Sequence, residues 1–242
     1  MAMFNLNYLK KSGLYIYIIF YLIFPNLAIA QSKQVALGTK LENSLNLKDI
    51  KSIQNSFEGK ESLSIPRKFS KILKEFTDLK WQIRSSEIIS GENIFDIKVI
   101  GKKIVGGEIF LLESNFKYFF STINNKINDG NIKNLLTTIR NDQNKIDITF
   151  RIPDKVLTGT KYDIDIILNE PLGEIIIAGG IKSHQDESFI KEEISIEPLS
   201  SGGIFKTTRA PASVGTQIWS GTIIHPEGIV SFTKSVEIVE QI

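Results

Sequence analysis

Apolar residues, most of them isoleucine, occupy every second position through much of residues 143–242. Ile146, Ile148 and Phe150 form one such series, and Tyr162 and Ile164 begin another. A period of two is typical of a β-strand that buries one face. Further short apolar runs are separated by turns rich in glycine and proline, at residues 175–177, 194–196, 204–205, 218–224 and 229–238. About seven short strands at this spacing predict an antiparallel, two-sheet sandwich of immunoglobulin-like type over residues 143–242.

The chain contains no cysteine. This composition excludes a disulfide framework, a catalytic thiol, an iron–sulfur cluster and a cysteine-ligated zinc. The cysteine pair and intervening tryptophan of antibody domains are therefore missing, and "immunoglobulin-like" refers to architecture only. Apolar packing alone must hold such a fold together.

Residues 48–142 differ from the rest because helical and strand periods follow each other. Asp49 can cap a short helix, and Pro66 suits the start of a longer helix over residues 66–77, whose apolar residues recur at helical spacing. Strands are expected at residues 79–84, 94–100, 110–123 and 132–140, with a hairpin turn at residues 128–131. The pattern predicts an α+β module of helices and a four-stranded meander, and the polar stretch 141–144 predicts the domain boundary.

The first thirty residues have the layout of a secretory signal peptide. Lys10 and Lys11 precede an unbroken apolar run over residues 14–24, and Ala28 and Ala30 are the small residues before Gln31. We expect cleavage between Ala30 and Gln31. The alternative is an uncleaved anchor, but the apolar run stops at a proline, short of the roughly 20 residues that a membrane span needs.

Cleavage would leave a mature chain with equal numbers of basic and acidic residues. The full chain has 29 lysines and arginines against 27 acids, and the signal segment carries two lysines and no acid. A neutral chain has no general electrostatic attraction for nucleic acid or for an anionic bilayer. Residues 31–47 are polar without a sustained apolar period, and we expect them to form a flexible lead-in.

Two resemblances extend this interpretation. The helix 66–76, the strand 79–85 and the hairpin 116–140 resemble the cone-shaped fold of nuclear transport factor 2 and ketosteroid isomerase, which implies three initial helices and a pocket in the cone. Residues 152–160 (IPDKVLTGT) and 170–173 (EPLG) resemble uncharacterised exported proteins of cyanobacteria. The second resemblance implies the periplasm, the thylakoid lumen or secretion, and no particular activity.

Enzymes with the cone fold often use an acid, a histidine or a tyrosine for proton transfer in an apolar pocket. The α+β module has no histidine, so Asp96 and Tyr118 are the candidate catalytic pair. Strand alternation places Asp96 opposite the more apolar face of Phe95, Ile97 and Val99. That placement favours a solvated acid and a packed phenol over a catalytic pair.

The remaining candidates lie in the β module. His184 and His225 are the only histidines, and with Asp186 they could form a metal site only if the fold brought them together. The spacing instead favours two loop histidines, and we expect neither a metal nor a cofactor. Trp219 has an ambiguous face; if exposed, it could anchor a partner protein.

The sequence therefore predicts an exported, non-catalytic binding or adaptor protein of the cell envelope, with an unknown protein partner. The alternative is a binder of small apolar ligands, or an isomerase-like enzyme, that uses a pocket lined by aromatic residues of the α+β module: Phe95, Phe116, Tyr118 and Phe120. An open pocket with a buried acid would distinguish the second hypothesis from the first.

Overall fold

The computed structural model describes residues 25–76, 78–86, 92–143, 146–169, 175–184 and 194–241. Three helices lead the described chain: α2 (Pro25–Asn46), α3 (Ile50–Asn55) and α4 (Glu61–Glu75). Four long strands follow as a meander, namely β1 (Asp78–Ser85), β2 (Asn93–Val105), β3 (Glu108–Ile123) and β4 (Lys126–Asn141). Within these ranges, no helix has the length and apolar character needed to cross a bilayer.

The remaining strands are β5 (Ile148–Arg151), β6 (Lys155–Leu157), β7 (Lys161–Leu168), β8 (Ile177–His184), β9 (Glu197–Leu199), β10 (Gly203–Arg209), β11 (Gly215–His225) and β12 (Gly228–Val239). The predicted fold class, a helix-containing module followed by an all-β one, is confirmed at this level.

One sheet extends through both parts of the chain. Its order is β1-β2-β3-β4-β12-β11-β8-β9, and β6 pairs with the end of β12, which makes nine strands. The two parts join where β4 pairs antiparallel with β12, from Val230 opposite Arg140 to Lys234 opposite Leu136. Beyond this point β12 takes β6 as its neighbour, from Glu237 onward. A separate three-stranded sheet has the order β10-β7-β5.

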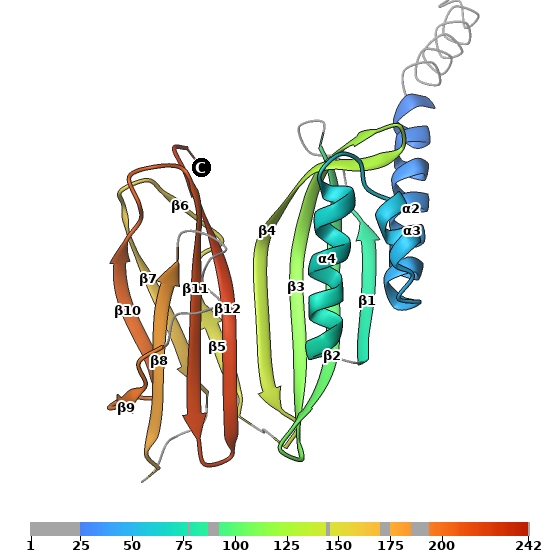
Figure 1. Ribbon diagram of the computed structural model, residues 1–242. Helices are drawn as coiled ribbons and strands as arrows, with labels where there is room; N and C mark the ends of the chain where they lie inside the picture. The colour runs from blue at the N-terminus through green and yellow to red at the C-terminus, as the bar shows by residue number, and fades with distance from the viewer. Residues whose placement is uncertain are drawn as a thin grey trace, which may run out of the picture.

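The two parts of the large sheet are covered on opposite faces. Helix α4 lies across β2 and β3 on one face, whereas β5, β7 and β10 lie behind β8, β11 and β12 (Figure 1). The register gives the reason. Thr138 of β4 pairs with Phe232 of β12, which lies in the core of the β module. On its other side, Thr138 pairs with Glu113 of β3, which faces away from the helices. Directly paired residues share a face, so the core face of one part continues as the open face of the other.

Each part has its own apolar core. Between the helices and β1–β4, the largest fully buried side chains include Phe95, Phe120 and Ile127. Between the two sheets, Ile164, Ile223 and Val236 are fully buried. The alternating isoleucines of the sequence therefore supply the second core, and two distinct cores are joined by one continuous sheet.

Helix α2 seals the edge of the sheet at β1. The Asn46 side chain donates to the carbonyl of Trp81 (3.0 Å) and accepts from its amide (2.8 Å), and Glu42 accepts from the amide of Ile83 (2.6 Å). Four helical residues rise about 6.0 Å and two strand residues about 6.6 Å, so residues four apart on α2 match residues two apart on β1. The helix thereby replaces a further strand, and it protects a sheet edge that could otherwise pair with another chain.

The prediction of a flexible lead-in at residues 31–47 is wrong, because α2 occupies most of it. The helix has little apolar periodicity, and its polar residues bond to the strand edge while Leu41 and Leu45 enter the core. Residues 1–24 of the predicted signal peptide lie outside the described residues. The predicted cleavage residues Ala28, Ala30 and Gln31 belong to α2.

Two expected boundaries also differ. Helix α4 begins at Glu61, so Pro66 lies inside the helix, where it is buried, and not at the first position. The turn between β3 and β4 is at Asn124 and Asn125, whose φ angles of 54° and 58° suit a two-residue hairpin, and not at residues 128–131. The capping role of Asp49 is confirmed, since its carboxylate accepts from the amides of Lys51 and Ser52 at 3.1 Å each.

Glycine at position 130 serves packing inside β4. A Cβ atom there would collide with the ring and hydroxyl of Tyr118. The Asp-Gly pair that resembles a hairpin turn is therefore required by the tyrosine that packs over it.

We expect Asn46→Ala to lower the free energy of unfolding by about 1 to 2 kcal/mol, because it removes two hydrogen bonds to the β1 backbone. Urea denaturation followed by far-ultraviolet circular dichroism measures this change. The matched control is Asn43→Ala, one turn earlier on the exposed side of α2. Equal destabilisation by both substitutions would show that the edge contact contributes nothing specific.

Candidate binding faces

Asp96 lies on the open face of the first part of the sheet. Its carboxylate accepts from Lys117 Nζ (2.8 Å) and from the Ser86 hydroxyl. Partial burial alone would raise the pKa of Asp96, but the hydrogen bonds from Lys117 and Ser86 and the charge of Arg84 hold that pKa below its ordinary value. The side chain is therefore an ionised member of a polar network and a poor proton acceptor.

Tyr118 lies on the opposite, helix-covered face, because it pairs with Phe95 while Asp96 pairs with Lys117. Its hydroxyl donates to Glu61 Oε2 at 3.2 Å, and Glu61 Oε1 accepts from the amide of Gly130 at 2.9 Å. Burial, followed by the negative charge of Glu61, raises the pKa of Tyr118 far above its ordinary value. The sheet thus separates the two predicted catalytic residues and does not bring them together.

The aromatic residues expected to line a pocket largely pack against one another. The ring centroids of Phe95 and Phe120 are 4.5 Å apart, and those of Tyr118 and Phe120 are 5.7 Å apart. Phe95 and Phe120 have no exposed surface. Side chains therefore occupy the space at these rings, where the alternative hypothesis requires a cavity.

Trp219 is buried and is not a surface anchor. Only 2% of it is exposed, and its indole Nε1 donates to the hydroxyl of Tyr162 at 2.8 Å. That hydroxyl donates in turn to Gln217 Oε1 at 2.7 Å. The strand pairing puts Trp219 opposite Lys234 on the core face of β12, which resolves the ambiguity of the sequence and excludes contact with a partner.

The two histidines lie at opposite ends of β11. His184 is opposite Ile218, whereas His225 ends the strand and pairs with Gly228. Seven residues of strand separate the two places by about 23 Å. The imidazole of His225 accepts from the amide of Glu227 at 3.1 Å, and Asp186 lies outside the described residues. The fold does not bring the histidines together.

The open face of β1–β4 has an excess of positive charge; we call it the basic face. Where the four strands lie side by side, the registers place seven cations and three acids on it: Lys80, Arg84, Lys98, Lys102, Lys117, Lys133 and Arg140 with Asp78, Asp96 and Glu113. Seven minus three gives +4, against +2 for the whole chain of 242 residues, so all the rest carries −2. The basic face is therefore a local concentration of charge on a nearly neutral protein.

Two acids of the basic face already have partners. Lys98 forms an ion pair with Glu113 at 2.7 Å, and Lys117 forms one with Asp96 at 2.8 Å. The cations Lys80, Arg84, Lys102 and Arg140 are exposed, and within the described ranges no ion pair forms at them. A hollow of about 560 Å³ lies at the part of the face near Arg84, with Gln82, Arg84 and Asn115 in its lining. The face thus offers four free positive groups, one of which lines an open hollow.

A second open face lies on the other side of the sheet, over β11 and β12; we call it the hydroxyl face. Ser220 and Thr233 form a cross-strand hydroxyl pair at 3.2 Å, and Thr222 and Ser231 another at 3.0 Å. All four side chains are partly exposed. The registers place Lys182 opposite Ser220 and Glu237 opposite Thr216 on this face, so it has no excess of positive charge, in contrast to the basic face.

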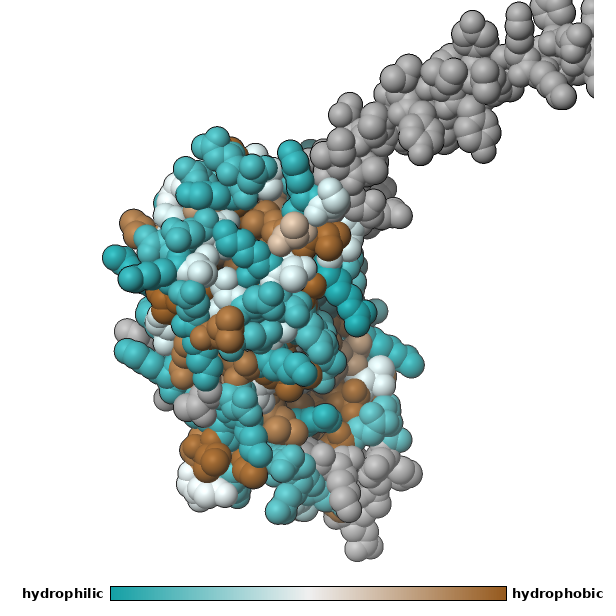
Figure 2. All heavy atoms as spheres, turned by 90° about the vertical axis from the view of Figure 1, so that its right-hand side faces the viewer, coloured by the Kyte–Doolittle hydropathy of each residue, from teal (hydrophilic) through white to brown (hydrophobic). Residues whose placement is uncertain are grey.

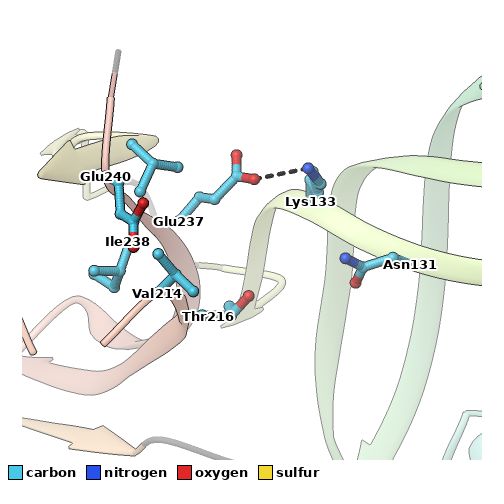
Figure 3. Close-up of a pocket in the computed structure, with 9 residues that line it drawn as sticks. Asn131, Lys133, Val214, Thr216, Glu237, Ile238 and Glu240 are labelled. Carbon is cyan, nitrogen blue, oxygen red and sulfur yellow. Dashed lines mark hydrogen bonds and ion pairs between the residues drawn. The ribbon is translucent and has the colours of Figure 1, made fainter. Parts of the chain in front are cut away.

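An ionic junction stabilises the place where β4 and β12 diverge (Figure 3). Lys133 of β4 donates to Glu237 of β12 at 2.7 Å, and Lys155 lies 3.4 Å from the other carboxylate oxygen. Asn131, Val214, Thr216 and Glu240 line the same cleft, whose volume is about 460 Å³. Burial alone would raise the pKa of Glu237, but the hydrogen bond and charge of Lys133 and the charge of Lys155 hold that pKa below its ordinary value.

Sequence reasoning missed both the junction and the basic face. Lys133 and Glu237 are 104 positions apart, and no local pattern connects them. Residues 79–84 alternate between apolar and polar side chains, which puts Lys80 and Arg84 on one face of a strand, and this signal could have led to the basic face.

Comparison with known proteins adds a family match for one part of the chain. Residues 143–239 match a family model described as "Domain of unknown function (DUF8623)". The matched range ends at Val239, the last residue of β12. A search of the curated proteins gave no match.

The ionic junction should make stability depend on pH. Because the folded-state pKa of Glu237 is depressed, its contribution is complete above the unfolded glutamate pKa of about 4.3 and disappears as the pH falls through the lower folded-state pKa. We expect Glu237→Gln to lower the free energy of unfolding at pH 7 by about 1 to 3 kcal/mol and to flatten its acid dependence.

Urea denaturation at a series of pH values measures this effect. Glu240→Gln, at an exposed position of the same cleft, is the control and should leave the profile unchanged. Parallel profiles for the wild type and Glu237→Gln would contradict a stabilising junction.

Proposed function

We propose that the protein is an exported, non-catalytic adaptor of the cell envelope that holds two partners on opposite sides of one sheet. The observation that carries this proposal is the opposite covering of the nine-stranded sheet, which leaves the basic face open on one side and the hydroxyl face open on the other. A partner on each face would be held in a fixed relative orientation. The proposal needs no cofactor and no nucleic acid, and membrane contact only through the signal segment before cleavage.

The continuity of the backbone ladder supports a rigid adaptor. Five residue pairs join β4 to β12, and the Ser235 hydroxyl accepts from the amide of Leu135 at 2.9 Å just beyond them. The Lys133–Glu237 pair adds a side-chain contact at the fork. Two domains connected only by a linker would move relative to each other, whereas a shared sheet supports one relative orientation.

The proposed architecture combines two known folds. We infer an immunoglobulin-like sandwich for residues 143–242, since the sheets β10-β7-β5 and β12-β11-β8 have the strand orders E-B-A and G-F-C of that fold. We infer a fold like that of nuclear transport factor 2 for residues 48–142. A four-stranded meander with helices on one face supports it, and α2 would extend the module toward the N-terminus.

The positions of the candidate residues favour binding over catalysis. Asp96 and Tyr118 are on different faces of the sheet, and the aromatic rings of the cone are in mutual contact. These observations support the adaptor over an apolar pocket with a proton-transfer group.

Export to the periplasm, the thylakoid lumen or the medium is part of the proposal, and it predicts a mature N-terminus at Gln31. Among the side chains of α2 that the structure describes, those that bond to the sheet lie beyond that position: Gln34, Glu42 and Asn46. Cleavage after Ala30 would therefore leave the sealed β1 edge intact. Mass spectrometry of the protein purified from its native envelope fraction measures the N-terminus, and a chain that still begins at Met1 would contradict export by cleavage.

Two partners on two faces predict that surface substitutions act separately. In capture from an envelope fraction, we expect Lys80→Glu with Arg84→Glu to lose one bound protein, and Thr222→Lys with Thr233→Lys to lose a different one. All four positions have at least partly exposed side chains. Quantitative mass spectrometry of the captured proteins, with thermal melting to confirm folding, measures the outcome.

The matched control is a charge reversal on helix α4, Lys71→Glu with Lys74→Glu, which should retain both proteins. Loss of the same protein from both face variants, or of none from either, would rule out a two-sided adaptor.

A further inference from the structure

The basic face differs from a small-molecule site. Its cations spread over all four strands, about 14 Å across, and from Lys80 to Arg84 about 13 Å along β1. Small-molecule sites are enclosed and mostly apolar, whereas this hollow is open and has charged residues in its lining. The size and openness of the face therefore indicate a macromolecular partner.

The residues between the cations indicate the class of that partner. Proteins that bind single-stranded nucleic acids stack successive bases on several aromatic side chains. The register places a single aromatic residue, Phe119, on this face, and Lys133 Nζ lies 5.0 Å from the centroid of its ring. Ile100 lies among the charges and is 41% exposed, with partly buried Leu111 and Leu136 near it. An apolar centre within a charged rim is the composition of a protein–protein interface.

The spacing of the cations matches an extended chain. The free cations Lys80 and Arg84 are four residues apart on β1, and on β2 the free Lys102 is four residues from Lys98, which pairs with Glu113. Carboxylates four residues apart on an extended segment lie at the same distance of about 13 Å. Such a segment lying along the strands could meet a cation at each of these carboxylates and place an apolar side chain near Ile100.

We propose that the basic face binds an extended, acidic protein segment that carries an apolar residue between its carboxylates. This inference rests on the proposed adaptor function and names the partner chemistry of one of its two faces. Charge complementarity selects the acidic segment, because four exposed cations are unpaired and two of the three acids already have lysine partners.

The test uses the full mature chain and a fluorescently labelled peptide of alternating glutamates with one central leucine. At about 50 mM salt, where surface charges are weakly screened, we expect fluorescence anisotropy to report binding. The variant Lys80→Glu, Arg84→Glu, Lys102→Glu should bind the peptide at least tenfold more weakly. Substitution of the same three residues by glutamine should give an intermediate affinity, and thermal melting should confirm that both variants fold.

The helix variant Arg67→Glu, Lys71→Glu, Lys74→Glu carries the same charge change on exposed positions of α4 and should bind like the wild type. Equal weakening by the helix variant would overturn the proposal, because it would reduce binding to net charge. Tighter binding of heparin or of anionic lipid vesicles than of the peptide would overturn it as well, since either would identify a different partner class.

The two proposals fail in different ways. If the peptide does not bind but capture still separates two proteins by face, then the partner chemistry is wrong and the adaptor function stands. If capture separates nothing, the adaptor function itself fails, whatever the peptide does.

Discussion

The pairing of β4 with β12 is the interaction on which the rest of the architecture depends. It converts two small sheets, each with its own core, into one nine-stranded sheet. The edge of a sheet carries unpaired amides and carbonyls that must be satisfied or protected. Here one edge of each part satisfies the other, while β6 takes over the end of β12 and α2 covers β1. Each of these edges is therefore protected in a different way, and only the pairing of β4 with β12 joins the two modules.

The parity of that pairing decides which surfaces remain open. Successive residues of a strand point to opposite faces, so a shift of one residue between β4 and β12 would put the three-stranded sheet on the same side as the helices. In the observed register Thr138 pairs with Phe232, and the two covers lie on opposite sides. The basic face and the hydroxyl face are thus consequences of a single register, and neither could be read from one strand alone.

The parts of the fold that the sequence predicted well are those governed by local period. Alternation located β1 to β4 and most strands of the β module, and Asp49 was correctly assigned as a cap. The failures have tertiary causes. Residues 31–46 show no apolar period because the helix uses its polar side chains to bond with a strand edge. The sequence Asp129-Gly130 resembles a turn, yet its glycine is required because Tyr118 packs against it from the neighbouring strand.

The candidate sites were less predictable than the fold, since only the register of the strands determines which charged residues share a face. Lys80, Lys102 and Arg140 are far apart in the sequence and lie on one face because three strand pairings align them. The same alignment explains which charges stay free. Asp96 and Glu113 are on the inner strands β2 and β3, where lysines from neighbouring strands neutralise them. Lys80 and Arg84 are on the outer strand β1, and β2 is their only neighbour in the sheet. Because two of the three acids of this face have lysine partners, the face presents unpaired cations to any partner, even though the protein as a whole is nearly neutral.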